Sequence, residues 1–405
     1  MIETALSRRQ MLGVMGVAAL SVTGCGSVGG DEESGDEGGS TALKVGLVIP
    51  QAGVYAPLGV DMKAGWDLYL AEHGGKLGGR SVKLVVADEG EAPDKGVPAV
   101  QRLVQRDDVD VLVGIVNSAT ALGAKDVVAG AKKLLIVSNA GADKLTAGDV
   151  PYVWRSSFTN GQIGFAVGEY LAKAPEGRDG AYAIAADYAA GNEASAGFKA
   201  GLEAGGGKLI DEAATPFGTT QDFQPFLSKV RSSGAGACYC FYAGAEAVAF
   251  VKQYQEFGLA DRIPLFGSGF LTEGGVLEAQ GKAATGVRTA LHYSAELDNP
   301  ANQAFVKAYR AKTGKPPTVY AMQTWDAAAL LDQAVKGADA LDGDALAKRL
   351  ESLGEVADSP RGAWSFEDRS PKQTVYLREV TPKGSGFVNA IEEELGSFGP
   401  APASA

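Results

Sequence analysis

The stretch 109–131, "VDVLVGIVNSATALGAKDVVAGA", decides the fold class of this chain. Residues 109–116 form a nearly unbroken apolar run, which is typical of a strand buried on both faces of a sheet. Asn117 and Ser118 then supply residue types that cap a helix, and apolar residues recur at helical spacing as far as residue 131. The stretch therefore predicts one β-strand followed directly by one α-helix, the repeating unit of a parallel sheet.

The same alternation extends on both sides of this stretch. Short runs rich in Val, Leu and Ile alternate with longer Ala-rich segments at helical period, which predicts a doubly wound α/β fold. The expected strands are 43–50, 81–88, 109–116, 133–139, 179–187, 207–216, 236–243 and 263–268. The expected helices lie near 58–73, 94–106, 118–131, 160–174, 191–205, 221–233, 244–258 and 274–280.

The alternation breaks at 149–161, "DVPYVWRSSFTNG", and then resumes, which predicts two similar Rossmann-like lobes. After Gly286 the order changes to an extended segment, three helices (302–313, 320–336 and 344–353) and a late strand at 372–381. A tail of this kind can return to each lobe in turn and build a hinge of several crossings. We therefore assign 43–158 plus 286–336 to lobe 1, 159–285 plus 337–390 to lobe 2, and 391–405 to a tail.

The N-terminal region has the pattern of an export signal. Arg8 and Arg9 precede an apolar run at 11–22 that is well short of the roughly 20 residues a membrane-spanning helix needs. The order "SRRQML" resembles a twin-arginine signal, with Met11 where Phe is usual, and "VTGC" resembles a lipobox ending at Cys25. We expect a signal peptide at 1–24, a lipid on Cys25 that tethers the protein outside the cell membrane, and a flexible acidic linker over 25–42.

Composition excludes several function classes. The net charge of -12 argues against nucleic-acid binding, which depends on Lys and Arg, so small solutes are the expected partners. His73 and His292 are the only histidines and have no ligand-type neighbours at metal-site spacing, so no metal is expected. Cys238 and Cys240 alternate along one strand, and we expect packed free thiols.

Catalytic motifs are also missing. The segment 205–209, "GGGKL", lacks the leading Gly and the Ser or Thr of a phosphate-binding loop, and Ser268 has Phe266 where a nucleophile elbow needs Gly. Two distant histidines do not supply a base for a nucleophile. We expect neither an enzyme nor a cofactor.

Candidate ligand contacts follow the strands of the first predicted lobe, because ligands of open α/β sheets bind beyond the carboxyl ends of the strands. Asn117 and Ser118 begin a helix and could offer amides and a hydroxyl to an anion. Asn139, Ala140, Gly141 and Ala142 follow the next strand, where small side chains let a ligand approach the backbone. A plain N-cap and a plain tight turn remain equally open interpretations.

In the second predicted lobe, aromatic residues follow the strands. Asp187 and Tyr188 follow one strand, Phe241 and Tyr242 another, and Gly269 and Phe270 a third, and of the second pair we take Tyr242 as the contact. Aromatic rings at one edge of a sheet could close over a flat or apolar solute, although each ring alone is more often a core residue. Together they predict a ligand pocket.

The body from Leu43 to about Thr381 resembles the leucine/isoleucine/valine-binding family of type I periplasmic binding proteins, the solute receptors of ABC importers. The segments that carry the resemblance are "LKVGLVIPQAGVYAPLGVDMKAGWDLYL", "DDVDVLVGIVNSATALGAKDVV", "LLIVSNAGADKLT", "YVWRSSFTNGQIG" and "NQAFVKAYRAKTGKPPTVYAMQTWDAAALL". It implies two lobes joined by three crossings, an ABC permease as partner and a monomer. The segments at 269–305 and 359–380 look more like the branch associated with aromatic compounds.

The resemblance also implies roles for particular residues. Family members that bind α-amino acids hold the carboxylate with a Ser where Ser118 stands, with a backbone amide where Ala140 stands, and with a Thr near Ala142. They hold the ammonium with a Glu where Gly269 stands, and Asp187 is a candidate replacement. The missing Thr and Glu point to an aromatic carboxylate. A branched-chain amino acid is the alternative ligand, and a ligand-sensing receptor component is the alternative of another class.

Overall fold

The computed structural model describes residues 42–400. The predicted signal peptide, the lipid on Cys25 and the linker up to residue 41 lie outside the described residues. Within residues 42–400, no helix combines the length and the hydropathy needed to span a bilayer.

The first sheet has six strands in the order β2-β3-β1-β4-β5-β6. Five of them run parallel, and only the short β2 is antiparallel, to β3. The strands are β1 (Leu43–Ile49), β2 (Lys76–Leu77), β3 (Arg80–Asp88), β4 (Val111–Gly114), β5 (Leu134–Val137) and β6 (Val153–Arg155). The strand and helix predicted from the stretch 109–131 are confirmed as β4 and α3 (Ser118–Ala131).

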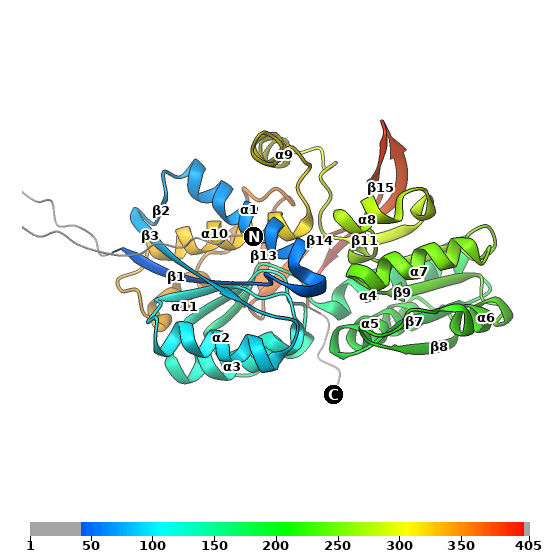
Figure 1. Cartoon of the computed structure of the whole chain (residues 1–405), viewed down its shortest axis with the longest axis horizontal. Helices are drawn as coiled ribbons and strands as arrows, with labels where there is room; N and C mark the ends of the chain where they lie inside the picture. Colours follow the sequence, from blue (N-terminus) through cyan, green and yellow to red (C-terminus); the bar gives the residue numbers. More distant parts are fainter. Residues whose placement is uncertain (1–41, 401–405) are drawn as a thin grey trace, which may run out of the picture. The chain divides into compact units, whose positions relative to one another are not determined.

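Helices cover both faces of this sheet (Figure 1). Alternate strand residues separate into two apolar clusters: Val111 and Val113 join the cluster of α1 (Ala56–Glu72) and α10 (Val319–Lys336), whereas Leu112 joins that of α2 (Pro93–Gln105) and α3. The axes of α1 and α10 come very close, since a Cβ at Gly65 would lie 2.1 Å from the Ala321 carbonyl oxygen. Packing on both faces explains the nearly unbroken apolar strands.

The second sheet has nine strands. Its path is β12-β13-β14-β11-β10-β9-β7-β8, and β15 pairs with β14. The parallel strands are β7 (Ala181–Asp187), β8 (Leu209–Pro216), β9 (Ala237–Phe241), β10 (Leu265–Ser268) and β11 (Arg288–Leu291). The antiparallel strands are β12 (Glu355–Val356), β13 (Trp364–Glu367), β14 (Ser370–Lys383) and β15 (Gly386–Phe398).

The remaining helices are α4 (Asn160–Lys173), α5 (Ala189–Ala204), α6 (Gln224–Ser232), α7 (Gly244–Glu256), α8 (Gly275–Gln280), α9 (Pro300–Thr313) and α11 (Gly343–Glu351). Five short 3-10 turns are η1 (Gly53–Tyr55), η2 (Asp143–Thr146), η3 (Pro175–Gly177), η4 (Gly269–Thr272) and η5 (Gly281–Ala284). Cys238 and Cys240 are buried free thiols, as predicted.

The chain passes between the two lobes three times. It leaves the first sheet after β6, returns after β11 to pack α10 against α1, and leaves again after α11 to form β12. Two doubly wound lobes with a three-crossing hinge are therefore confirmed.

The assignment of the late elements to lobes differs from the prediction. β11 lies inside the span 286–336 that was given to lobe 1, yet it pairs with β10 and β14 of the second sheet. α11 lies in the span given to lobe 2, yet it packs against β5 of the first. Most of the predicted tail belongs to β15. Local pattern identifies an element, whereas the sheet it joins depends on tertiary pairing.

Candidate ligand-binding cleft

A narrow cavity of about 50 Å³ lies between residues of the two lobes. Its lining comes from β4, β5 and their following turns on one side, and from β7, β9 and β10 on the other. The lining residues are Tyr55, Leu58, Val116, Asn117, Ser118, Asn139, Gly141, Phe158, Asn160, Tyr188, Ala190, Phe241, Ala243, Phe270 and Tyr320.

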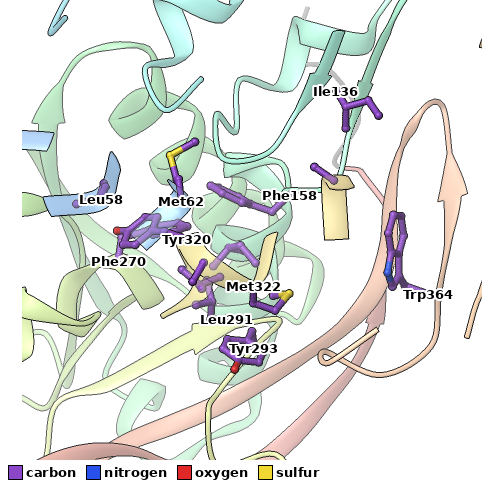
Figure 2. Packing of buried hydrophobic residues seen from close by; sticks show 14 of the residues in the cluster. Leu58, Met62, Ile136, Phe158, Phe270, Leu291, Tyr293, Tyr320, Met322 and Trp364 are labelled. Atoms are coloured by element: carbon purple, nitrogen blue, oxygen red, sulfur yellow. The ribbon is translucent and has the colours of Figure 1, made fainter. Parts of the chain in front are cut away.

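Six aromatic rings make up much of this lining. The ring centroid of Phe270 lies 4.7 Å from that of Phe158, 6.0 Å from that of Tyr320 and 6.5 Å from that of Phe241. Figure 2 shows Phe270 and Tyr320 close together, with Leu58 and Phe158 nearby. Tyr55 and Tyr188 are joined by a hydrogen bond between their side chains. Such a wall suits a flat apolar group.

The start of α3 supplies polar groups on the first-lobe side. The Asn117 side chain caps the helix by accepting a hydrogen bond of 2.9 Å from the Thr120 amide. Ser118, the first residue of α3, is 4% exposed and lines the cavity. Its hydroxyl is a donor that a ligand in the cavity could use.

The turn after β5 adds a second group of this kind. Asn139 is 4% exposed, and its Oδ1 atom has no hydrogen-bond partner in the described part of the chain. Gly141 packs closely against two other lining residues, because a Cβ there would lie 2.5 Å from both Asn160 Oδ1 and Phe158 Cε2. The Asn139 Nδ2 atom donates to Ser138 Oγ at 3.3 Å, so only the amide oxygen of this side chain is left without a partner within residues 42–400.

None of the residues that line the cavity carries a formal charge. The buried cations nearby are used elsewhere: Arg155 donates to the carbonyl oxygens of Phe158 and Ala142 at 2.9 Å, and Arg378 forms a 3.1 Å ion pair with Glu273. The cavity can therefore hold an anion only through neutral donors, and it offers no carboxylate to an ammonium group.

Six predicted contacts line the cavity: Asn117, Ser118, Asn139, Gly141, Tyr188 and Phe270. Ala140 and Ala142 do not, although both are buried. The Ala140 amide donates to the Ile115 carbonyl at 2.9 Å and so is not available to a ligand carboxylate.

Three predicted contacts of the second lobe lie outside the lining. Asp187 is exposed and accepts a hydrogen bond from Asn192 at 3.2 Å. The Gly269 carbonyl accepts from Arg378 at 3.2 Å, where a side chain at residue 269 would clash with the guanidinium. Tyr242 packs in the opposite apolar cluster and contacts Thr215 through its hydroxyl at 3.1 Å. Phe241 faces the cavity instead, because neighbouring strand residues point to opposite faces.

The sequence interpretation missed Tyr55, Leu58, Val116, Phe158, Asn160, Ala190, Ala243 and Tyr320, and it named Phe241 beside Tyr242 without choosing it as the contact. Phe158 could have been found, since it lies just beyond the carboxyl end of a strand. Tyr320 lies on α10, far along the chain, and only the hinge topology places it at the cavity.

The chain belongs to the periplasmic binding protein family, whose sequence model matches residues 42–385. A Leu/Ile/Val-binding protein homolog 6 from Brucella melitensis is 32% identical over 355 residues, which make up 85% of this chain and 89% of the relative. Membership confirms the predicted fold class and the predicted non-enzymatic, solute-binding nature of the protein.

Solved structures of solute-binding proteins of ABC transporters are similar along most of the chain. One from R. palustris, in complex with benzoate, is 41% identical with a TM-score of 0.79 and covers 88% of this chain and 97% of its own. Another, from Rhodopseudomonas palustris BisB5 in complex with 3,4-dihydroxybenzoic acid, is 31% identical with a TM-score of 0.81. It covers 89% of this chain and 99% of its own. The similarity therefore includes both lobes and the hinge.

Proposed function

We propose that this protein is the solute-binding component of an ABC importer and that its cleft binds a small aromatic carboxylate. The observation that carries the proposal is a cavity of uncharged residues with six aromatic rings and, on one side, the start of α3 with Ser118. The relative that is 41% identical and was solved with benzoate supports the same ligand class.

The carboxylate would lie at the start of α3 and the turn after β5. Ser118 and the free amides of the first helical turn would donate to it, and the positive end of the helix dipole would favour its charge. The Asn139 Nδ2 group, which donates one hydrogen to Ser138 Oγ at 3.3 Å, would direct its second hydrogen to the ligand. The rings of Phe158, Phe270 and Tyr320 would enclose the body of the ligand.

A branched-chain amino acid is the second candidate, since relatives named Leu/Ile/Val-binding proteins are up to 32% identical. Its ammonium group would need a carboxylate partner, because a buried unpaired charge costs several kcal/mol. The described lining contains no Asp or Glu, and Asp187 is exposed. The charge balance of the cleft therefore favours the aromatic acid.

A thermal-shift screen tests this choice. Benzoate and its hydroxylated forms should raise the melting temperature of the 43–400 body, because a ligand at 100 times its dissociation constant stabilises the folded state by about 2.7 kcal/mol. Leucine, isoleucine and valine should leave it unchanged. A shift with leucine and none with any benzoate would reverse the assignment.

We further propose that the chain is exported, by the twin-arginine route, and is tethered to the cell membrane through Cys25 as a monomer that serves an ABC permease. The sequence "VTGC" and the twin arginines Arg8 and Arg9 support this. Cells fed a clickable fatty acid should label the wild-type protein but not Cys25→Ala. Equal labelling of both would rule out the anchor.

A further inference from the structure

A buried carboxylate lies directly behind the polar end of the cleft. Glu89, just after β3, is fully buried and accepts hydrogen bonds from the amides of Val116, at 2.9 Å, and Asn117. Val116 and Asn117 also line the cavity, and Ser118 follows them. Glu89 and the proposed ligand carboxylate would thus occupy two sides of the same turn.

The groups around Glu89 offer it no positive charge. Its own segment contributes Asp88, whose charge opposes its ionisation, and η1 contributes the neutral hydroxyl of Tyr55. Gly96 of α2 packs against the backbone carbonyl of Glu89 and against Thr120 of α3, while Lys95 is exposed and makes no ion pair with Glu89. Among the described residues, no cation pairs with this carboxylate.

Burial without a cation makes the ionised form of Glu89 costly, and it raises the pKa of this carboxyl to about 7. Both forms are therefore populated near neutral pH. An anion at Ser118 would repel an ionised Glu89 through a poorly solvated turn, and the cavity lining has no cation to offset the repulsion. Binding would then favour the protonated form.

We propose that the cleft binds its carboxylate ligand together with one proton, which Glu89 takes from solvent on binding and returns when the ligand leaves. The inference rests on the proposed function, because it needs an anionic ligand at the start of α3. It adds a property that an uncharged lining alone does not imply, namely an affinity that falls as the pH rises.

Two other carboxylates near the cleft must be separated from Glu89. Asp143 accepts from the Gly161 amide, and Glu193 accepts from Asn160, a lining residue, at 2.8 Å. Burial raises the pKa of both, that of Asp143 to about 7. Unlike Glu89, both feel the positive charge of Arg155.

The test is calorimetric titration of benzoate into the folded body at several pH values between 6 and 8.5, each in two buffers with different ionisation enthalpies. The difference between buffers counts the protons taken up. We expect uptake of about half a proton per ligand at pH 7, rising toward one at pH 8, and a dissociation constant that rises with pH by up to about tenfold per unit. This measurement needs no variant.

Variants assign the proton to a residue. Glu89→Gln keeps an acceptor for the two amides and should abolish both the uptake and the pH dependence. Asp110→Asn is the matched control, because Asp110 is a half-buried carboxylate that also accepts a backbone amide, that of Lys44 at 2.8 Å, just before β4 and at the opposite end of that strand from the cavity, and it should behave as wild type. Uptake that survives in Glu89→Gln but disappears in Asp143→Asn would overturn the assignment.

The remaining outcomes separate the two proposals. Benzoate binding without proton uptake would overturn the proton-linked inference and leave the proposed function intact. Failure of benzoate and hydroxybenzoates to bind at any pH would contradict the proposed function, and the inference with it.

Discussion

The rings of Phe158 and Phe270 lie 4.7 Å apart, centroid to centroid, although one follows β6 of the first sheet and the other follows β10 of the second. The contact joins the two lobes at the wall of the cavity. A ligand between the lobes would therefore contact rings that belong to both.

Replacing one of these rings should weaken ligand binding more than it weakens the fold. Phe270→Leu removes an aromatic face from the cavity, and we expect benzoate to bind about tenfold more weakly, since an aromatic pair contributes about 0.5–1.5 kcal/mol beyond its buried area. Phe198→Leu is the control, because Phe198 stacks on Tyr239 in the core, outside the cavity. Equal loss of affinity in both variants would contradict the assignment.

The polar end of the cleft can be tested by charge. Asn139→Asp puts a carboxylate beside the proposed ligand carboxylate, and benzoate affinity should fall by more than tenfold in calorimetry. Ser118→Ala removes one donor and should cost about 1 kcal/mol of binding free energy, or about fivefold in affinity. Ser228→Ala removes an exposed hydroxyl on α6 and should change neither. Unchanged benzoate affinity in Asn139→Asp would contradict the proposed position of the ligand carboxylate beside Asn139.

The hinge contains a buried ion pair whose loss should destabilise the fold. Arg361 and Asp326 lie 2.8 Å apart, both almost fully buried, and Arg361 also donates to the carbonyl oxygens of Ser156 and Ser157 in the first crossing. Arg361→Met leaves a buried unpaired carboxylate, so the free energy of unfolding in urea should fall by about 3–5 kcal/mol.

Two comparisons show whether burial explains that loss. Combining Arg361→Met with Asp326→Leu should restore much of the stability, because neither charge then remains unpaired. Arg102→Met breaks an exposed pair with Asp107 and should cost less than about 1 kcal/mol. If Arg361→Met costs no more than Arg102→Met, the hinge does not depend on this pair.

Glu89 should also make the ligand-free stability depend on pH. Its folded-state pKa, about 7, is raised above the ordinary value of 4.5, so the folded protein holds a proton there that the unfolded chain has lost. Glu89 therefore stabilises the folded state fully at pH values below about 4.5, and this stabilisation is lost as the pH rises through 7. The melting temperature of the wild type relative to Glu89→Gln should fall from pH 5 to pH 8. A constant difference would mean that Glu89 titrates normally.

Local patterns predicted most of the individual elements. The apolar run at 109–116 identified a strand because both faces of β4 are buried, and Asn117 identified the start of α3 because its side chain caps that helix. β15 was not found, because its run of Glu residues lacks the alternation of a half-buried strand.

The candidate site was predicted best where a residue directly follows a strand. Ser118, Asn139 and Phe270 line the cavity for that reason. Phe241 lines the cavity and Tyr242 does not, because successive strand residues point to opposite faces of the sheet, and the apolar run alone does not show which of the two faces the cavity. Tyr320 was beyond local reasoning, because only the packing of α10 against α1 brings it to the cleft.

The central claim is that the cleft binds an aromatic carboxylate and not an α-amino acid. Calorimetric titration of the 43–400 body with benzoate, and separately with leucine, at pH 6.5 tests it most directly. The account predicts saturable benzoate binding with a dissociation constant near the micromolar range, worth about 8 kcal/mol, and no heat of binding with leucine. Saturable binding of leucine with none of benzoate would contradict it.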